Sequence, residues 1–525
     1  MHQLAKTNHT LAVAVLFLWT LGIRAALLGQ APFADEGHYA AASYFQFLGY
    51  TQGVFAENSI IPNFGIIEIY SLLFSWVYLL PINGYISLRV IDAVIAGLTT
   101  IMMFKYLYIV SRQQLAACLA ALLLATAINH PLFIEAGARN PIPAATCLLF
   151  CSLYLLERQR GKKLLPAALC LAGAVLVREP FVAIAGVVVL HVFHQYKLRS
   201  AVLFSLYGLA GCLAGFLLVG LLKGGLAGIS TNFLSYFQFT QLDASVNLDF
   251  RARLALAASQ AAEMSTALGF CLPIVLLGLL APLLTPALRT PRALAPYWLG
   301  IGIALASLLE AAIKKPYPYH LAQFLIGLGI FACYGFQILI AWIRAIRQSS
   351  PAAALLCVTA VFVGHGLLAT DYARVLRYAA AWTIHFAPVM IFNDWNSPVV
   401  KDSYFLSVAS IVKNNSRQDD VILSTFYNVY PLTHRLPPNR DIASVAVFQR
   451  QQASESANRS IIQIINEQQP AVFIQEVSEL QRLRPATGPV EIAVAANYSS
   501  AVDVGPGLFP YRKFSAKVHL HALPH

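Results

Sequence analysis

The feature that most constrains the fold is a series of apolar runs about as long as a bilayer is thick. An α-helix rises about 1.5 Å per residue, so about 20 apolar residues cross the hydrocarbon core. Only 11% of the residues are charged, against about 25% in a soluble domain. We therefore predict an all-α polytopic membrane protein with about 11 transmembrane helices. The runs begin near Leu11, Ile86, Leu115, Pro141, Leu164, Phe181, Ala201, Thr266, Leu294, Tyr319 and Pro351.

The charges of the short loops predict the orientation in the membrane. Loops rich in Lys and Arg stay in the cytoplasm. If the ambiguous run Phe64–Leu80 dips into the membrane without crossing it, the most basic short loops all fall on one side. We therefore predict a non-crossing Phe64–Leu80, an inside N-terminus and an outside C-terminus. The loops that decide this contain Lys6, Arg112, residues 157–163, Lys197, Arg289 and Arg344.

Charge and cysteine content exclude several classes of protein. The net charge of +12 does not indicate nucleic-acid binding, because the basic residues are scattered through short loops. All 8 cysteines lie in apolar runs, which argues against a disulfide framework or a cysteine metal cluster. The first apolar run is long enough to be an uncleaved anchor rather than a cleaved signal.

The polar tail differs in character from the rest. We predict a transmembrane domain over 1–370 that contains a first outer loop at 31–85, a linker over 371–402, and an outer α/β domain over 403–525. Within the tail, short apolar stretches predict strands and one segment has helical periodicity. The predicted strands are Asp420–Ser424, Ala471–Ile474 and, as a third candidate, Val490–Val494; the predicted helix is Ser454–Gln469.

Two adjacent carboxylates, Asp35 and Glu36, directly follow the first span. Acidic residues at the mouth of a span are expensive unless they serve a function. Asp35 is our candidate general base, and Glu36 would orient the acceptor or tune the pKa of its neighbour. The alternative is structural, because acidic residues also suit the first turn of a helix. His38 and Tyr39 would add polar contacts.

Several of the predicted outer loops carry cations, namely Arg139, Arg178, Lys314 and Lys315. Either they hold an anionic ligand, or they snorkel to lipid headgroups. A carboxylate together with such cations suits transfer of a sugar from a phosphate-linked lipid. The phosphate leaves as a stable anion, so the reaction needs one base and positive charge but no general acid.

The first outer loop resembles that of the C-type glycosyltransferases, in the branch of the protein O-mannosyltransferases and the lipid A aminoarabinose transferases. The resemblance rests on Asp35–Tyr39, then Glu57, then the Pro-led stretch 62–70; weaker likeness extends to Ser87–Ala93, Ala138–Pro141, Leu176–Pro180 and Lys314–His320.

This resemblance implies a polyprenyl-phosphate sugar donor and inversion at the anomeric carbon. On it, Lys314, Lys315, Arg178 and Arg139 become phosphate-clamp candidates, and Tyr317, Tyr319 and His320 line the donor pocket. The tyrosines also fit an interfacial aromatic belt. Glu57 marks a second acidic site, and Glu310 would neutralise one of the lysines.

Other interpretations stay open. Oxygens of Asp35, Glu36 and Glu57 could hold Mg²⁺ or Mn²⁺, although we expect no required cofactor. A transporter or flippase for a lipid-linked or small anionic substrate is the main rival, and a polyprenyl-pyrophosphate-dependent glycan ligase or polymerase is the second. The expected partners are membrane lipids, the donor and a glycan, lipid or protein acceptor, with no nucleic acid. The expected location is a bacterial inner membrane, with the site on the periplasmic face.

Overall fold

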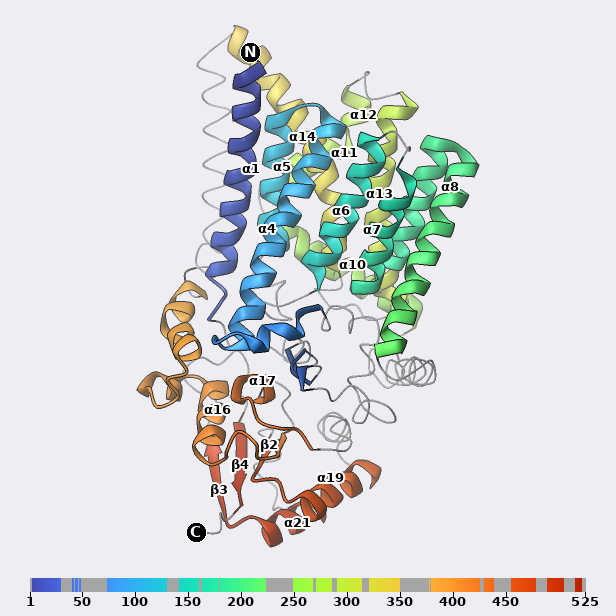
Figure 1. Ribbon diagram of the computed structural model, residues 1–525. Coiled ribbons are helices and arrows are strands. Elements are labelled where there is room, and N and C mark those ends of the chain that lie inside the picture. The colour runs from blue at the N-terminus through green and yellow to red at the C-terminus, as the bar shows by residue number, and fades with distance from the viewer. Residues whose placement is uncertain are drawn as a thin grey trace.

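The computed structural model describes residues 2–29, 40, 41, 43–45, 47, 48, 73–129, 141–159, 163–178, 180–222, 249–267, 271–285, 290–313, 321–349, 377, 379–424, 429–438, 455–477, 489–504 and 515–521. These residues form a bundle of long helices and, beyond one end of it, a smaller part that contains a sheet (Figure 1). We call the end of the bundle that faces the sheet the outer end, and the opposite end the inner end.

Most of the predicted apolar runs that the structure describes correspond to helices of the bundle. Where α4 begins, Asn83 accepts a hydrogen bond from the Tyr85 N–H at 2.9 Å and so caps the helix. Lys197 interrupts α8 with a φ of 73°, which separates the two predicted runs from Phe181 and Ala201. The helices are α1 (His2–Ala25), α4 (Gly84–Ser111), α5 (Gln114–Ile128), α6 (Ile142–Arg158), α7 (Leu164–Val177), α8 (Phe181–Leu222), α10 (Phe250–Ala267), α11 (Cys271–Leu279), α12 (Ala281–Leu284), α13 (Pro291–Ile313) and α14 (Ala322–Ser349).

Several helices are long and apolar enough to cross a bilayer. In the described residues there are 4 of them: Gly84–Ser111, Phe181–Leu218, Leu294–Ile313 and Ala322–Ile346. Shorter apolar helices accompany them at His9–Ala25, Gln114–Ile128, Leu164–Val177 and Ala379–Phe392. The predicted run from Pro351 lies outside the described residues, so a total of about 11 spans stays a prediction.

The two termini of the chain lie toward opposite ends of the bundle. The N-terminus lies at the inner end, and the C-terminus lies beyond the outer end (Figure 1). The Arg89 side chain donates a hydrogen bond to the Leu28 carbonyl, so the chain leaves α1 and enters α4 at the same end. The non-crossing interpretation of Phe64–Leu80 requires this. Its described part forms only a short 3-10 helix, η2 (Ser75–Leu79).

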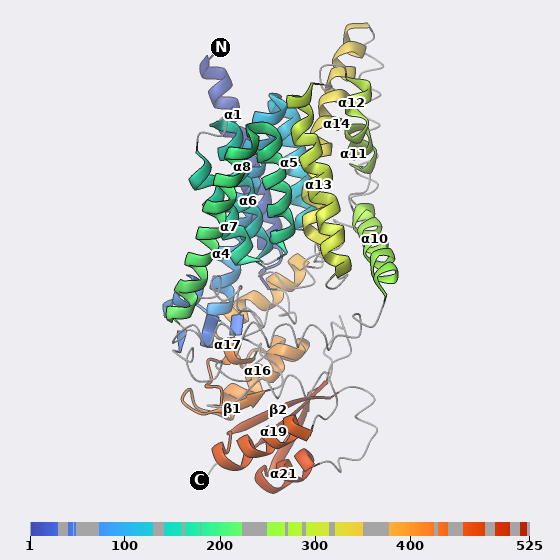
Figure 2. The same cartoon turned by 90° about the vertical axis from the view of Figure 1, so that its right-hand side faces the viewer.

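Two helices lie outside the predicted apolar runs. Helix α10 begins between the predicted runs from Ala201 and Thr266 and packs against α13 (Figure 2). Helix Ala379–Phe392 falls in the predicted linker. Its Thr383 hydroxyl accepts from the Gly29 N–H at 2.8 Å and donates to the Ala26 carbonyl at 2.7 Å. The chain after the last predicted span is therefore attached to the outer end of α1.

The tail forms a four-stranded sheet in the order β1-β2-β4-β3. Strands β1 and β2 are parallel, and the other neighbours are antiparallel. Helices α19 and α21 share a core with Leu423 and Phe473, while α16 packs against β3 and β4. The elements are η6 (Pro398–Asp402), α16 (Tyr404–Asn414), β1 (Ile422–Ser424), α17 (Val429–Thr433), α19 (Glu455–Gln468), β2 (Val472–Val477), α21 (Pro489–Asn497), β3 (Ser500–Val504) and β4 (Ser515–Leu520).

The first two predicted strands and the predicted helix of the tail are confirmed as β1, β2 and α19. The third predicted strand, Val490–Val494, is wrong, because these residues lie in α21. Val490, Ala493 and Val494 are buried whereas Ile492 is 65% exposed, which is the three-to-four-residue period of a helix. Pro489 at the first position of the helix and the alanines that follow also favour helix over strand.

Candidate functional site

Buried polar side chains gather at the outer end of the bundle, and we call this group the outer polar layer. Each of its members is at most 8% exposed, and together they carry three guanidinium groups against two carboxylates. The layer consists of Arg24 on α1, Arg89 and Asp92 on α4, Asn129 after α5, Arg178 after α7, Glu310 on α13 and Gln323 on α14.

The packing of α13 on α14 places Glu310 and Gln323 at one depth. The two antiparallel helices approach closely at Gly327, where an added Cβ would lie 3.1 Å from the Ala304 Cβ. Toward the outer end, Glu310 is about 9 Å from Ala304 along the helix axis, and Gln323 is about 6 Å from Gly327. The two side chains therefore lie within about one helical turn of the same level.

Arg178 lies at this level on the opposite side of α13. Helices α8 and α13 meet where Gly302 contacts Val187. Glu310 is about 12 Å from Gly302 along α13, and the start of α8 at Phe181 is about 9 Å from Val187. The Arg178 carbonyl accepts from the Phe181 N–H at 3.1 Å, so Arg178 directly precedes this start. The Arg178 side chain thus enters the bundle close to the depth of Glu310.

Asn129 belongs to the same layer through the contact between α5 and α14. Leu124 packs against Gly329, and counting outward from this contact gives about 7.5 Å to Asn129 and about 9 Å to Gln323. The Asn129 amide donates to the Ala125 carbonyl at 2.7 Å, as a residue at the end of a helix often does.

The α1–α4 side of the layer carries most of its charge. Arg24 is 3% exposed, Asp92 is fully buried and Arg89 is 1% exposed. The Arg89 guanidinium donates to the Leu28 carbonyl at 2.5 Å, and it lies 4.7 Å from the centre of the Tyr85 ring. Two interactions thus hold Arg89 in place at the junction of α1 and α4.

Three members of the layer have polar atoms with no hydrogen-bond partner in the described part of the chain. They are the Arg178 Nε, the Asn129 Oδ1, and both the Oε1 and Nε2 of Gln323. Arg178 is 4% exposed and Gln323 is 1% exposed. A buried polar group without a partner costs about 1–3 kcal/mol. Such groups at one depth indicate a place where a polar ligand or water completes the hydrogen bonding.

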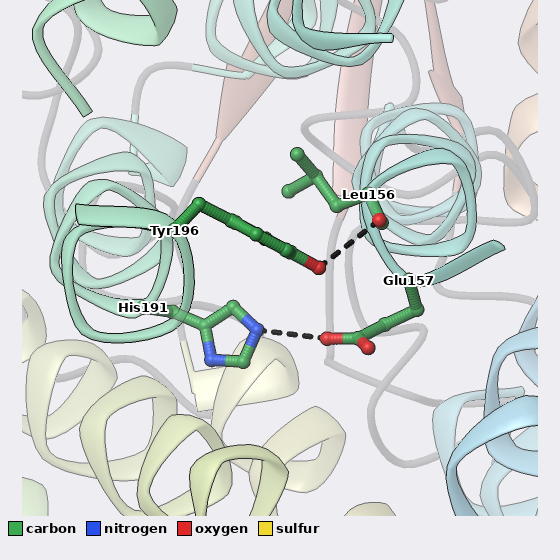
Figure 3. A network of polar contacts seen from close by, with 4 residues as sticks. All are labelled: Leu156, Glu157, His191 and Tyr196. Carbon is green, nitrogen blue, oxygen red and sulfur yellow. Dashed lines mark hydrogen bonds and ion pairs between the residues drawn. The ribbon is translucent and has the colours of Figure 1, made fainter. Parts of the chain in front are cut away.

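At the inner end of the bundle, several polar side chains are hydrogen-bonded (Figure 3). The His191 Nε2 lies 3.0 Å from the Glu157 Oε1, and the Tyr196 hydroxyl donates to the Leu156 carbonyl at 3.1 Å. On α14, the Gln337 Nε2 donates to the Ser111 carbonyl at 2.6 Å. We call this group the inner polar cluster.

Of the site residues predicted from sequence, the structure describes Arg178, which lies in the outer polar layer. The others lie outside the described residues: Asp35, Glu36, His38, Tyr39, Glu57, Arg139, Lys314, Lys315, Tyr317, Tyr319 and His320. The described residues that flank Lys314–His320, Ile313 and Leu321, are both at the outer end of the bundle. Glu310 is in the layer, whereas its predicted pairing with a lysine involves undescribed residues.

The site residues predicted from sequence do not include Arg24, Arg89, Asp92, Asn129 or Gln323. Arg89 and Asp92 carry a signal, because two opposite charges three residues apart inside an apolar run are rare. Asn129 and Gln323 carry almost none, since each stands alone beside a helix end. The structure also shows that Arg253 donates to the Ile313 carbonyl at 2.9 Å, a cation at the C-terminal end of α13.

Among solved structures, the chain has the fold of the C-type membrane glycosyltransferases. The structures that it resembles are of ArnT from Cupriavidus metallidurans, the lipid A aminoarabinose transferase. The apo structure has a TM-score of 0.52, and the structure bound to undecaprenyl phosphate has a TM-score of 0.54. Both are 13% identical to this chain and cover 98% of it, and the chain covers 98% and 99% of theirs.

This likeness confirms the predicted class of fold, and together with the apolar helices it makes the chain an integral membrane protein. At the level of sequence, no family model and no curated protein matches the chain. The resemblance is therefore visible in the three-dimensional arrangement and in a few outer-loop residues.

Proposed function

We propose that the chain is an inverting glycosyltransferase that moves a hexosyl or pentosyl group from a polyprenyl-phosphate donor to an acceptor hydroxyl or phosphate. One observation carries the proposal. The buried Arg178 guanidinium has no partner for its Nε among the described residues, in a fold shared with a protein whose crystal structure holds undecaprenyl phosphate. A guanidinium matches a phosphate in charge and in hydrogen-bonding geometry.

The reaction follows from the groups in their proposed roles. The acceptor oxygen attacks the anomeric carbon from the face opposite the phosphate and loses its proton to the Asp35 carboxylate. The bond between the anomeric carbon and the phosphate oxygen breaks, and the phosphate leaves with the electron pair. Arg178 stabilises the charge that develops on this phosphate, and preorganised donors in a dry site are effective in this role.

The remaining predicted residues take supporting roles in this proposal. Lys314, Lys315 and Arg139 add positive charge for the donor phosphate. Glu36 orients the acceptor, and Glu57 adds a second acidic contact. Side chains that suit the donor pocket are His38, Tyr39, Tyr317, Tyr319 and His320.

The phosphate is already a stable leaving anion, so the proposed reaction needs no metal. Transfer should therefore persist after treatment with EDTA, and a strict requirement for Mg²⁺ or Mn²⁺ would contradict this part of the proposal. The acceptor is a lipid, a glycan or a protein. The site faces the periplasm of a bacterial inner membrane, on the side of the basic-poor loops.

Replacing the proposed base tests the function directly. The full chain in proteoliposomes is given a polyprenyl-phosphate sugar with a labelled sugar and an envelope extract as acceptor. Asp35→Asn should reduce transfer by about 100-fold or more, since a positioned base contributes about 10²–10⁴-fold. Asp503→Asn, an exposed carboxylate on β3, is the matched control and should retain transfer.

Equal transfer by Asp35→Asn and wild type would refute Asp35 as the base. Movement of the labelled lipid between leaflets without any transfer would instead favour the transporter interpretation. Transfer that requires a pyrophosphate-linked donor would favour the ligase or polymerase interpretation.

A further inference from the structure

The tail and the first outer loop share one hydrophobic core. On the loop side, Tyr44 is 3% exposed and Phe45 is fully buried. On the tail side, Tyr430 of α17 is fully buried in the same cluster. The shared core continues into the sheet, because it also includes Val472 of β2. The two regions, far apart in sequence, are thus packed as one unit.

Aromatic rings make the contact between the two regions. The Phe45 ring lies edge-on to the Tyr430 ring, with the ring centres 5.3 Å apart. The His434 ring stacks on Tyr44 at 5.7 Å, and it lies edge-on to Tyr78 of η2 at 5.9 Å. We call these five residues the aromatic clasp.

The tail side of the clasp is held firmly by the sheet. The Tyr430 hydroxyl accepts from the Ser424 N–H at 3.0 Å and donates to the Ile422 carbonyl at 3.2 Å, which fixes the ring to β1. His434 has a φ of 56°, a left-handed conformation that is uncommon for a residue with a side chain. Its position is therefore determined by the surrounding structure rather than by local preference.

The loop side of the clasp is joined to η2 as well as to the tail, since the Tyr44 and Tyr78 ring centres are 5.1 Å apart. The Tyr78 hydroxyl donates to the Ala40 carbonyl at 2.9 Å, and the Leu48 N–H donates to the Tyr44 carbonyl at 3.0 Å. The first bond joins Ala40 to η2, and the second lies within the segment 40–48. The Tyr44 and Phe45 rings in turn contact the His434 and Tyr430 rings of the tail.

We propose that the α/β tail is a positioning element for the first outer loop, and that the aromatic clasp is the contact through which it acts. Residues 40–48 follow the proposed base, Asp35, by a few positions in the chain. The tail fixes where this segment lies and thereby the direction from which the base approaches the acceptor. Tyr44, Phe45, Tyr430 and His434 are positioning residues. Their link to catalysis rests on the proposed function, whereas the contacts of the clasp do not depend on it.

Hydrogen exchange and kinetics together test the proposal on the full chain in detergent or nanodiscs. His434→Asn removes the ring and keeps a residue that tolerates the left-handed backbone. Amide exchange in peptides covering 40–48 should become about 10-fold faster, because ring contacts of this kind contribute about that factor. The kcat of transfer should fall by a similar factor of about 10, with KM for the lipid donor unchanged.

Two further variants separate positioning from a general loss of structure. His519→Leu removes a histidine ring of the same tail that stacks on Phe473 at 5.7 Å, away from the loop, and should change neither exchange at 40–48 nor kcat. Tyr44→Leu should reproduce the effects of His434→Asn, and Tyr44→Phe should restore both. The double variant Tyr44→Leu, His434→Asn should be no worse than either single variant.

The outcomes distinguish this proposal from the proposed function. Unchanged exchange at 40–48 in His434→Asn would overturn the clasp. Faster exchange with unchanged kcat would overturn its role in positioning. If the wild type shows no transfer at all, the proposed function fails, and the exchange measurement alone then decides whether the tail holds the loop.

Discussion

The outer polar layer and the inner polar cluster differ in how their buried polar groups are bonded. Helix α14 carries a glutamine near each end. Gln337 at the inner end donates to the Ser111 carbonyl, whereas Gln323 at the outer end has no partner among the described residues although it is 1% exposed. One helix thus has a glutamine that completes the structure and another that leaves hydrogen-bonding capacity unused.

The same difference holds for the charged groups. At the inner end, His191 and Glu157 are 3.0 Å apart and satisfy each other. At the outer end, the Arg178 Nε has no partner in the described residues. Breaking a buried pair destabilises a fold, because one polar group is then left without a partner. A buried group that is already unpaired can be lost without that cost and is retained where a ligand uses it. Substitutions at the inner end should therefore affect stability, and those at the outer end should affect function.

The largest effect is expected for Arg178→Met. Loss of one preorganised donor to a developing anion costs about 10²–10³ in kcat, so transfer should fall by that factor while thermal stability is kept. Arg178→Lys retains the charge and should recover part of the activity. Arg344→Met, at the exposed inner end of α14, is the control. Thermal unfolding is followed by intrinsic fluorescence. An unfolding temperature of Arg178→Met clearly below that of wild type would contradict the comparison.

His191→Leu should act in the opposite sense. It leaves the Glu157 carboxylate, 19% exposed, without its imidazole partner, which should lower the free energy of unfolding by about 2 kcal/mol. The kcat of the protein that remains folded should be unchanged. The double variant His191→Leu, Glu157→Leu should recover stability, because no carboxylate is then left without a partner. A loss of kcat at full stability would show that the inner polar cluster is functional.

Acid should loosen the outer end through His434. Burial, and then the positive charges of Lys413 and Arg435, lower the pKa of His434 to about 4 from its usual 6.5. His434 therefore binds fewer protons when the aromatic clasp is formed than when its ring is exposed to water. The stability of the clasp is full above pH 6.5 and declines as the pH falls toward 4. About 2 kcal/mol should be lost by pH 5.

This loss of stability should appear as faster amide hydrogen exchange at residues 40–48. The exchange is measured from pH 7 to pH 5 and corrected for intrinsic exchange rates. The groups that face His434 are the Tyr44 and Tyr78 rings with Lys413 and Arg435. Burial also lowers the pKa of Lys413 to about 8, so this lysine is already charged over that range and does not add to the transition. Protection that is independent of pH in wild type would exclude His434 as its source.

The smallest effect is expected for the two glutamines of α14. Gln323→Leu removes an unsatisfied amide and should raise the free energy of unfolding by about 1 kcal/mol, while transfer falls by up to about 10-fold if the amide binds the donor. Gln337→Leu removes a paired amide and should lower stability by about 1 kcal/mol with transfer unchanged. Changes of the same sign in both variants would remove the distinction between the two ends.

Much of the architecture could be predicted from the residues alone. Apolar runs and loop charges gave the helices, the break of α8 near Lys197 and the common end of α1 and α4, because lipid demands long apolar helices and disfavours buried charge. The tail was harder. Val490–Val494 is apolar enough for a strand. Only the pattern of its buried residues, which repeats every three to four positions, identifies it as a helix. Strands β3 and β4 are short and mixed in polarity, so their pairing with β2 is needed to recognise them.

Some residues of the candidate site could be recognised from the sequence, and others only from the structure. Arg178 stands out in the sequence as a cation on the outer side, and Arg89 with Asp92 is a charged pair inside a span. Gln323 and Asn129 become notable only when the depths of α5, α13 and α14 are compared, because an unsatisfied amide is defined by neighbours from other helices.

The sequence by itself determined that this protein spans a membrane and which side its polar tail occupies relative to the N-terminus. It also determined which acidic and basic residues are candidates for the site. These properties follow from transfer of single segments between water and lipid, and each segment carries its own free energy of transfer. Tertiary structure alone decided which buried polar groups are paired and at what depth the unpaired ones lie. It also decided that the tail packs against the first outer loop. Those properties depend on distances between residues hundreds of positions apart, and no single segment encodes them.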